Sequence, residues 1–441
     1  MAPVTDFAVK EKYGYLSGFG SYHSSEAFPD ANPLVINSPQ KPPYGLRTER
    51  ISGTSFTAPR SKNLQTWMYR TTSSLVHTEF ELLEEAQPAP SSMTPNGYMW
   101  PSFSVDKDTD WTRQKLLARN GDPADKRGTA IWVFAVTKNM EDRNVFSSLD
   151  GDQLIIVQAG ALDIQTELGK LLVRQNEIAM IPRGIRYQVT LATPFARGYV
   201  CELFQGHWDL PELGPIGSTG LANVRDFQIP SAYYDGKLEN GVAKANNAEW
   251  TIVSRMNGQL WACTQDHTPF DVAAWHGTYY PFKYDLARYC VMGNVLFDEH
   301  DPSLYAVLSA TTGDNPGASA CDFLIIPPRW QATDAFWLPY YHRNTHSEFY
   351  GPIINRQDPE FPPNKGLEFK PFGAGLNGPM TTHGPSEEDF QKASNMELKP
   401  AMLQNEGVTV FLLETEKPLY LSDWATKAAL KNFGGKPRPK I

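Results

Sequence analysis

Hydrophobic runs, several of them alternating with polar residues, follow one another closely between residues 129 and 205. They occupy 130–136, 153–158, 160–169, 178–189 and 198–203, and Gly, Pro and Asp residues separate them. Alternation with a period of two is typical of a strand that buries one face. Short strands at intervals of about ten residues, with turn residues between them, predict a β-sandwich or barrel.

A second region of the same character begins near residue 286, with hydrophobic runs at 305–308, 323–326 and 408–414. The segment 206–285 is a long connection rich in Pro and Gly, and it holds a predicted hairpin at 250–263. Short helices are predicted at 111–118 and 387–395. The pattern therefore predicts an all-β protein with a few short helices, divided into residues 1–285 and 286–441.

Length, charge and cysteine content narrow the class of protein. The chain has 441 residues, too many for one typical core, and its formal net charge is −9. No basic run is present, so nucleic acid is not expected as a partner. No apolar run of signal-peptide or membrane-spanning type occurs, and the four cysteines form no CxxC pair. We therefore expect a cytoplasmic protein with free thiols and no membrane contact.

Candidate chemistry is concentrated in two stretches of the second half. His342 and Glu348 are six residues apart, and His383 follows about 35 residues after Glu348. On a strand, an even spacing would place His342 and Glu348 on one face. Two imidazoles and one carboxylate form the facial triad that favours Fe(II) and leaves positions open for substrate and O₂. The alternative is that these histidines only make structural hydrogen bonds.

The chain resembles the homogentisate 1,2-dioxygenase family along most of its length. The matching stretches include SGFGSYHSSEA from Ser17, PYGLRTERISGTSFTAPR from Pro43, ELGPIGSTGLANVRDF from Glu212, QDHTPFDVAAWHG from Gln265, FLIIPPRW from Phe323 and YYHRNTHSEF from Tyr340. A further match is the stretch from Asp150 to Gly184. Its Ile-Pro-Arg-Gly end is similar to the turn of a cupin jelly roll.

The resemblance implies cupin-like (bicupin or jelly-roll) β-sandwich domains and Fe(II) held by His342, Glu348 and His383. Residues 1–285 would then contain a metal-free cupin-like half, and residues 286–441 would form the iron-binding domain. The expected partners are a small aromatic substrate and O₂. The resemblance also implies a homo-oligomer, a trimer or a hexamer.

Several positions near the expected site depart from the family pattern. The family's basic histidine position holds Glu299, with His300 one place later, and a second family histidine is Asn377. A substrate-contacting tyrosine aligns with Gln357, and an apolar residue between the ligands is His346. An amide at residue 377 could make room for a larger substrate, or it could replace a ligand or a base.

From the resemblance and these departures we predict roles for individual residues. Glu299 or His300 is predicted to act as the catalytic base. The predicted substrate contacts are Arg343, Asn344, Gln357 and Asn377, and His300 or His346 is a candidate additional iron ligand. Arg343 could equally be a structural ion-pair residue.

The changed residues favour a substrate other than homogentisate. We expect a non-haem Fe(II) dioxygenase that cleaves a C–C bond in a larger phenol or quinol, such as an anthraquinone-type aromatic polyketide of secondary metabolism. The alternatives are homogentisate cleavage in tyrosine and phenylalanine catabolism, and a non-catalytic cupin-like binding protein.

Overall fold

The structure is a computed structural model that describes residues 10–104, 106, 108–212, 214, 219–292, 304–312, 318–331, 340–354, 371–397, 399–403 and 409–430. Within them, the largest sheet has 14 strands. Ten of these form one continuous path: β1 (Tyr15–Ser17), β15 (Gln228–Pro230), β21 (Phe282–Asp285), β12 (Glu177–Ile181), β10 (Asp152–Thr166), β13 (Tyr187–Leu203), β9 (Asn144–Ser148), β18 (Trp250–Met256), β19 (Gln259–Gln265) and β5 (Glu81–Glu84). The other four are β7 (Lys115–Asp122), β8 (Arg127–Val136), β11 (Gly169–Arg174) and β30 (Tyr420–Leu421).

Smaller sheets and helices occur in both parts of the chain. A four-stranded sheet contains β2 (His23–Glu26), β20 (Val272–Gly277), β4 (Gln65–Arg70) and β3 (Arg47–Ser52). Two-stranded pairs are β14 (Gly220–Leu221) with β22 (Cys290–Val291), β16 (Gly236–Glu239) with β17 (Val242–Ala245), and β25 (Arg329–Gln331) with β28 (Ala401–Leu403). The helices are α1 (Glu387–Ser394), α2 (Asp423–Ala428) and the 3₁₀ turns η1 (Pro43–Gly45), η2 (Val224–Asp226) and η3 (Leu286–Arg288).

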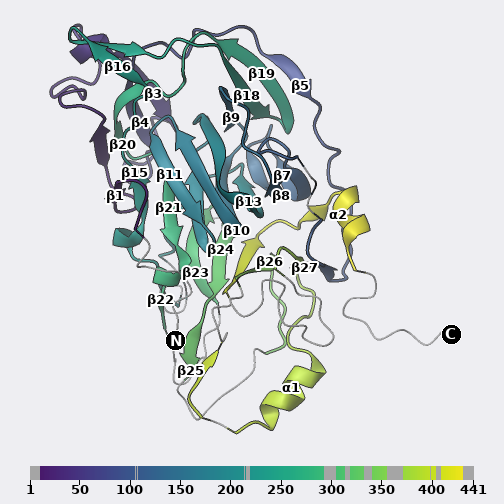
Figure 1. Ribbon diagram of the computed structural model, residues 1–441. Coiled ribbons are helices and arrows are strands. Elements are labelled where there is room, and N and C mark those ends of the chain that lie inside the picture. Colours follow the sequence, from purple (N-terminus) through teal and green to yellow (C-terminus); the bar gives the residue numbers. More distant parts are fainter. Residues whose placement is uncertain are drawn as a thin grey trace.

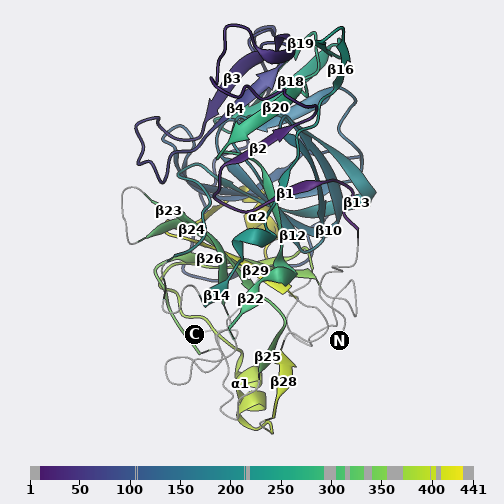
Figure 2. The ribbon, with the colours of Figure 1, turned by 90° about the vertical axis from the view of Figure 1, so that its left-hand side faces the viewer.

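A six-stranded antiparallel sheet carries the second part of the chain. Its strands, in spatial order, are β23 (Tyr305–Thr311), β24 (Ser319–Ile326), β29 (Thr409–Thr415), β26 (Ser347–Ile354), β27 (Ala374–Asn377) and β6 (Tyr98–Trp100). Figures 1 and 2 place this sheet between the four-stranded sheet at the top of the molecule and α1 at the bottom.

One face of the six-stranded sheet packs into the main hydrophobic core through residues such as Phe323, Phe349 and Phe411. Because side chains alternate along a strand, the residues between these point to the opposite face. That opposite face carries Asp322, Glu348 and Glu414. The sheet therefore separates an apolar core from a face with acidic side chains.

The expectation of an all-β fold with a few short helices is confirmed. The hairpin at 250–263 and the helix at 387–395 are also found, as β18–β19 and α1. The predicted helix at 111–118 is wrong. Its residues 115–118 belong to β7, which pairs with β8 on one side and β30 on the other. A short apolar run that is buried by strands on both sides cannot be distinguished from a buried helix by its periodicity.

Strands are exchanged between the two predicted parts of the chain. From the first part, β6 pairs with β27, and β30 from the far end of the second part pairs with β7. The boundary at residue 285 stays a prediction. No helix among the described residues is long and apolar enough to cross a membrane.

A buried carboxylate explains why the chain turns as it does after β12. Asp152 is fully buried, and it accepts hydrogen bonds from the backbone N–H of Arg183 (3.0 Å), the Arg183 Nε (2.9 Å) and the Tyr279 hydroxyl (2.6 Å). Its other oxygen lies 2.6 Å from the His207 Nδ1. Burial opposes ionisation, but the charges and hydrogen bonds of Arg183 and His207 hold the pKa of Asp152 well below its usual range. The Ile-Pro-Arg-Gly turn is thus fastened to the start of β10.

Replacing Asp152 with asparagine is expected to destabilise the protein by about 3–5 kcal/mol at neutral pH, because Arg183 would lose its buried counter-charge. A carboxyl with a lowered folded-state pKa stabilises the fold above its unfolded pKa of about 4, and this contribution is lost as the pH falls further. Urea-unfolding midpoints of wild type and variant should therefore differ most above about pH 5, and the difference should shrink only as the pH falls below about 4 toward the folded-state pKa of Asp152. A difference independent of pH would contradict the assigned role of the charge.

Candidate metal centre

Two of the three proposed ligands face each other on an isolated antiparallel bridge. The backbone N–H of His342 donates to the His383 carbonyl at 2.9 Å, and the His383 N–H donates to the His342 carbonyl at 3.1 Å. His342 lies outside any strand, because β26 begins at Ser347. His342 and Glu348 therefore do not share one strand, as their even spacing predicted, and the bridge brings the two histidines together instead.

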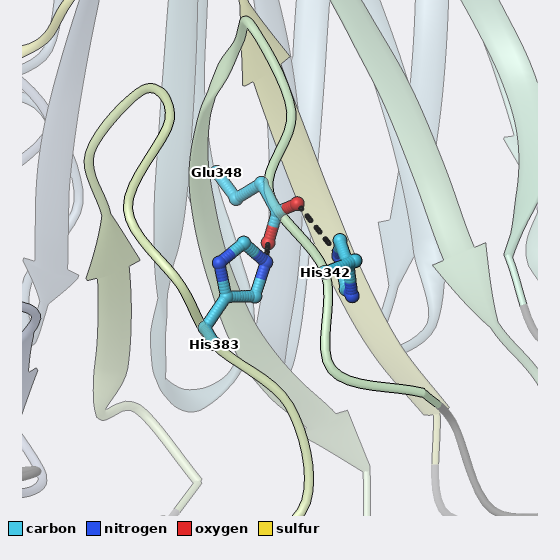
Figure 3. A group of neighbouring side chains, drawn as sticks. All are labelled: His342, Glu348 and His383. Carbon is cyan, nitrogen blue, oxygen red and sulfur yellow. Dashed lines mark ion pairs between the residues drawn. The ribbon is translucent and has the colours of Figure 1, made fainter.

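The three side chains converge on one point (Figure 3). The Nε2 of His383 is 2.8 Å from the Glu348 Oε2, and the Nε2 of His342 is 3.4 Å from the Glu348 Oε1. One possible ligand atom from each residue lies within 4.8 Å of the others. Glu348 is buried, whereas both histidines are partly accessible. The site thus has a buried carboxylate and an open side.

Hydrogen bonds fix which imidazole nitrogen can bind a cation. The Nδ1 of His342 is 3.1 Å from the Tyr340 carbonyl, and the Nδ1 of His383 is 2.9 Å from the Thr381 carbonyl. A carbonyl only accepts, so each Nδ1 carries the proton when the ring is neutral. Each Nε2 then turns a lone pair toward the Glu348 carboxylate. Lone pairs facing a carboxylate at these distances fit a shared cation.

The charges around the triad support the same conclusion. Burial opposes ionisation of Glu348, but the hydrogen bond and charge of His383 and the hydrogen bond of Asn344 hold the pKa of Glu348 below its usual value. Burial lowers the pKa of His383, but the hydrogen bond and charge of Glu348 outweigh this, so the pKa is raised. When the ring is neutral, the buried Nε2 of His383 carries no proton and has no hydrogen-bond donor beside it among the described residues. A cation would satisfy this atom.

Glu348 belongs to a row of polar residues that crosses four neighbouring strands. Asp322 on β24 lies opposite Glu414 on β29, Glu414 lies opposite Glu348, and Glu348 lies opposite Asn377 on β27. Burial raises the pKa of Glu414 to about 7, and the negative charges of Glu348 and Asp322 add to this effect. Three carboxyl groups side by side make this face of the sheet strongly attractive to a cation.

Asn344 supports the carboxylate directly. Its Nδ2 donates a hydrogen bond to the Glu348 Oε1, and its Oδ1 accepts one from the backbone N–H of His346 at 3.0 Å. Its side chain, predicted to contact substrate, is therefore occupied in orienting Glu348. Groups that orient a metal ligand in this way tune the affinity of a metal site.

The structure places the other predicted residues as follows. His346 is not part of the three-residue group, and its Nδ1 lies 3.2 Å from the Thr345 hydroxyl. Arg343 is exposed. Asn377 lies opposite Glu348. Glu299, His300 and Gln357 lie outside the described residues, so their roles stay predictions.

Two neighbours of the triad escaped the sequence analysis, although signals for both were present. Tyr350 follows Glu348 by two residues and therefore shares its face of β26. Glu414 is a charged residue within the apolar run of β29. A charge inside such a run indicates that the strand has a special environment on one face.

The residues present fit a non-haem Fe(II) ion. Two imidazole Nε2 atoms and one carboxylate, with an accessible side, form the donor set of the facial triad. Substrate and O₂ would approach from that accessible side. Among the described residues, no other three His, Cys, Asp or Glu side chains bring their ligand atoms within 4.8 Å of one another.

Comparison with known proteins places the chain in a family. The model described as "Homogentisate 1,2-dioxygenase N-terminal" matches residues 14–286, and the one described as "Homogentisate 1,2-dioxygenase C-terminal" matches residues 287–433. A homogentisate 1,2-dioxygenase from Emericella nidulans is 47% identical, with 97% of this chain and 94% of that protein covered. The human homogentisate 1,2-dioxygenase is 40% identical, with 94% and 92% covered.

Solved structures give weaker similarity. The E. coli protein Ylba aligns with 74% of this chain and 94% of its own at a TM-score of 0.33 and 7% identity. A cupin 2 conserved barrel domain protein from Leptotrichia buccalis aligns with 71% and 92% at a TM-score of 0.28 and 8% identity. Similarity at this level supports no conclusion about activity. The matches in sequence are full-length, however, and they show that the chain belongs to the homogentisate 1,2-dioxygenase family, whose members are non-haem iron dioxygenases that cleave aromatic rings.

Proposed function

We propose that this protein cleaves the ring of homogentisate with O₂, as a step of tyrosine and phenylalanine breakdown. The observation that carries the proposal is identity of 40–47% to proteins of that name over nearly the whole chain. The converging His342, Glu348 and His383 supply a site suited to the reaction. In the proposed reaction one C–C bond of the ring breaks and both atoms of O₂ enter the product.

Each residue of the centre has a distinct part in the proposal. His342, Glu348 and His383 hold Fe(II), and Asn344 keeps the Glu348 carboxylate in its orientation. Fe(II) held by these residues would bring the phenolic substrate and O₂ together and would allow triplet O₂ to react with the ring. The reaction also needs a base for the phenolic proton, a role for which Glu299 or His300 stays the prediction.

The expectation of a larger phenol or quinol from secondary metabolism is wrong. It rested on changed residues near the expected site, chiefly Glu299, Gln357 and Asn377. The curated relatives, which match along the full chain, are named for homogentisate instead. The nearly full-length matches to proteins of that name outweigh these differences, and two of the changed positions, Glu299 and Gln357, lie outside the described residues. The alternative of a non-catalytic binding protein is not retained either, because the chain belongs to a family of enzymes.

Assembly into a trimer or hexamer stays a prediction. The exposed side chains of Leu34, Val35 and Ile36 support it, since adjacent apolar residues at a surface commonly mark a protein–protein contact.

The proposed function predicts that protein loaded with Fe(II) under anaerobic conditions consumes O₂ when homogentisate is added. With ¹⁸O₂, mass spectrometry should find both labelled atoms in a ring-opened product. Metal-free protein and the Glu348→Gln variant serve as controls, and neither should consume O₂ above background. Protein that retains iron yet leaves homogentisate intact would contradict the proposal.

A further inference from the structure

Tyr350 shares the metal-binding face of the six-stranded sheet. It follows Glu348 by two residues on β26, so both side chains point to the same side. Its neighbours across the sheet are Leu412 on β29 and Gly375 on β27. Tyr350 therefore lies beside the row formed by Asp322, Glu414, Glu348 and Asn377, two residues along β26 from the proposed metal ligand.

Gly375 shows where the tyrosine ring lies. A Cβ added to Gly375 would come within 2.3 Å of the Tyr350 Cζ and 2.5 Å of its hydroxyl oxygen. These distances are far below van der Waals contact, so the ring occupies the space that any larger residue would fill. The ring of Tyr350 thus lies across β27, with its hydroxyl end over that strand.

The hydroxyl meets the side chain of Asn377, two residues along β27 from Gly375. Asn377 forms a hydrogen bond with the phenol.

The register places this hydrogen-bonded pair directly beside the metal ligand. Asn377 is opposite Glu348, whose carboxylate faces the two imidazoles. A free amide can rotate and exchange its donor and acceptor ends, whereas an amide that is hydrogen-bonded to a fixed phenol cannot. The remaining hydrogen-bonding groups of Asn377 then keep one orientation next to the centre.

We propose that Tyr350 is a positioning residue that fixes the Asn377 amide, and that this amide orients the aromatic substrate by hydrogen bonding to one of its oxygens. The inference rests on the proposed function and extends it to a pair of residues. An amide suits a hydroquinone carboxylate because it can donate to a phenolate or carboxylate oxygen and accept from a hydroxyl. Tyr350 itself acts through Asn377.

The test uses Fe(II)-loaded protein with Tyr350→Phe, Asn377→Ala and the double variant. Loss of one oriented hydrogen bond is expected to raise both KM and the anaerobic dissociation constant for homogentisate about 5- to 10-fold. The turnover number should change by less than this factor. The double variant should resemble either single variant, because residues that act as one unit give non-additive effects.

A matched control is Tyr98→Phe, which removes a hydroxyl from the neighbouring strand β6 that is hydrogen-bonded to Thr94 at 3.1 Å. It should leave KM and substrate binding unchanged. A second approach is Gly375→Ala, which would displace the ring without removing the hydroxyl and should also raise KM. Iron content and melting temperature, measured for every variant, separate positioning from a loss of metal or of fold.

Several outcomes would overturn the inference. Tyr350→Phe with the KM and binding constant of wild type would do so, and so would fully additive effects in the double variant. Loss of iron from Tyr350→Phe would show that the tyrosine supports Glu348 and not the substrate. Failure of wild-type protein to act on homogentisate while it retains iron would instead contradict the proposed function, so the two failures are distinguishable.

Discussion

Replacing Glu348 with glutamine is expected to abolish tight iron binding and ring cleavage together. The variant keeps the shape of the side chain but removes the anionic ligand that both imidazoles face. Loss of a residue that only orients a ligand typically costs about 10- to 100-fold in metal affinity or activity. Loss of the ligand itself should exceed about 100-fold in both quantities. Iron per chain after anaerobic loading and O₂ uptake with homogentisate measure the two effects.

The same substitution should leave the metal-free protein folded. Burial and the neighbouring charges of Glu348 and Asp322 raise the pKa of Glu414 to about 7, so the carboxyl groups of this row repel one another in the absence of a cation. Removing one charge relieves that repulsion but also removes the contact of the Glu348 carboxylate with His383. Because the two effects oppose each other, the melting temperature of the metal-free variant should stay close to that of metal-free wild type. Glu387→Gln, on the exposed surface of α1, is a matched control that should retain iron and activity.

Tight iron binding by the Glu348 variant would show that the carboxylate is not a ligand. Loss of iron shows that Glu348 is a ligand only if the variant stays folded, so the melting temperature of the variant is measured as well. His383→Ala then provides an independent route, because His383 approaches Glu348 from a different segment of the chain.

Replacing Arg70 with methionine is expected to be the most destabilising single change in the first half of the protein. Arg70 is fully buried, and its guanidinium contacts Asp271 at 2.9 Å and both Glu167 and Glu49 at 3.1 Å. A further N–H donates to the Pro269 carbonyl at 3.1 Å. Methionine would fill the space but leave two buried carboxylates without a counter-charge, at a cost of at least about 3–5 kcal/mol. Urea unfolding at neutral pH measures the loss.

A conservative variant and a surface control make this result interpretable. Arg70→Lys keeps the charge but cannot reproduce the planar fork of hydrogen bonds, so an intermediate loss is expected. Arg113→Met breaks an exposed ion pair with Glu84 at 2.7 Å and should cost no more than about 1 kcal/mol. If Arg70→Met cost as little as the surface control, the buried network would not contribute to stability as argued.

The row of carboxyl groups formed by Asp322, Glu414 and Glu348 offers a physical reason for the position of the metal centre. Asp322 at one end accepts hydrogen bonds from the Ser309 and Ser319 hydroxyls, each at 2.5 Å, which offset its burial. Glu348 toward the other end has two imidazoles and Asn344. Glu414 lies between them with two acidic neighbours. A divalent cation at Glu348 would reduce this repulsion, so metal binding should also stabilise the sheet.

From the sequence alone, the class of fold could be predicted and the three residues proposed as iron ligands could be named. In the second part of β10 and the first part of β13, buried and more accessible residues alternate because one face lies against the core, and periodicity reports this local pattern. The residue types at His342, Glu348 and His383 carry their chemistry wherever the chain places them. The helix predicted at 111–118 failed because pairing with two neighbouring strands, which no local pattern encodes, decides the structure of β7.

Tertiary structure alone decided how the centre is assembled and what surrounds it. His342 reaches its place through a bridge to His383, and even spacing from Glu348 has no part in it. Glu414 and Asn377 lie beside Glu348 because of strand register, which links positions far apart in the chain. Register depends on the packing of a whole sheet face, since a slip of one residue would turn every side chain to the opposite side. The chemical types of the three proposed ligands can therefore be read from the sequence, whereas the residues beside them depend on the complete fold.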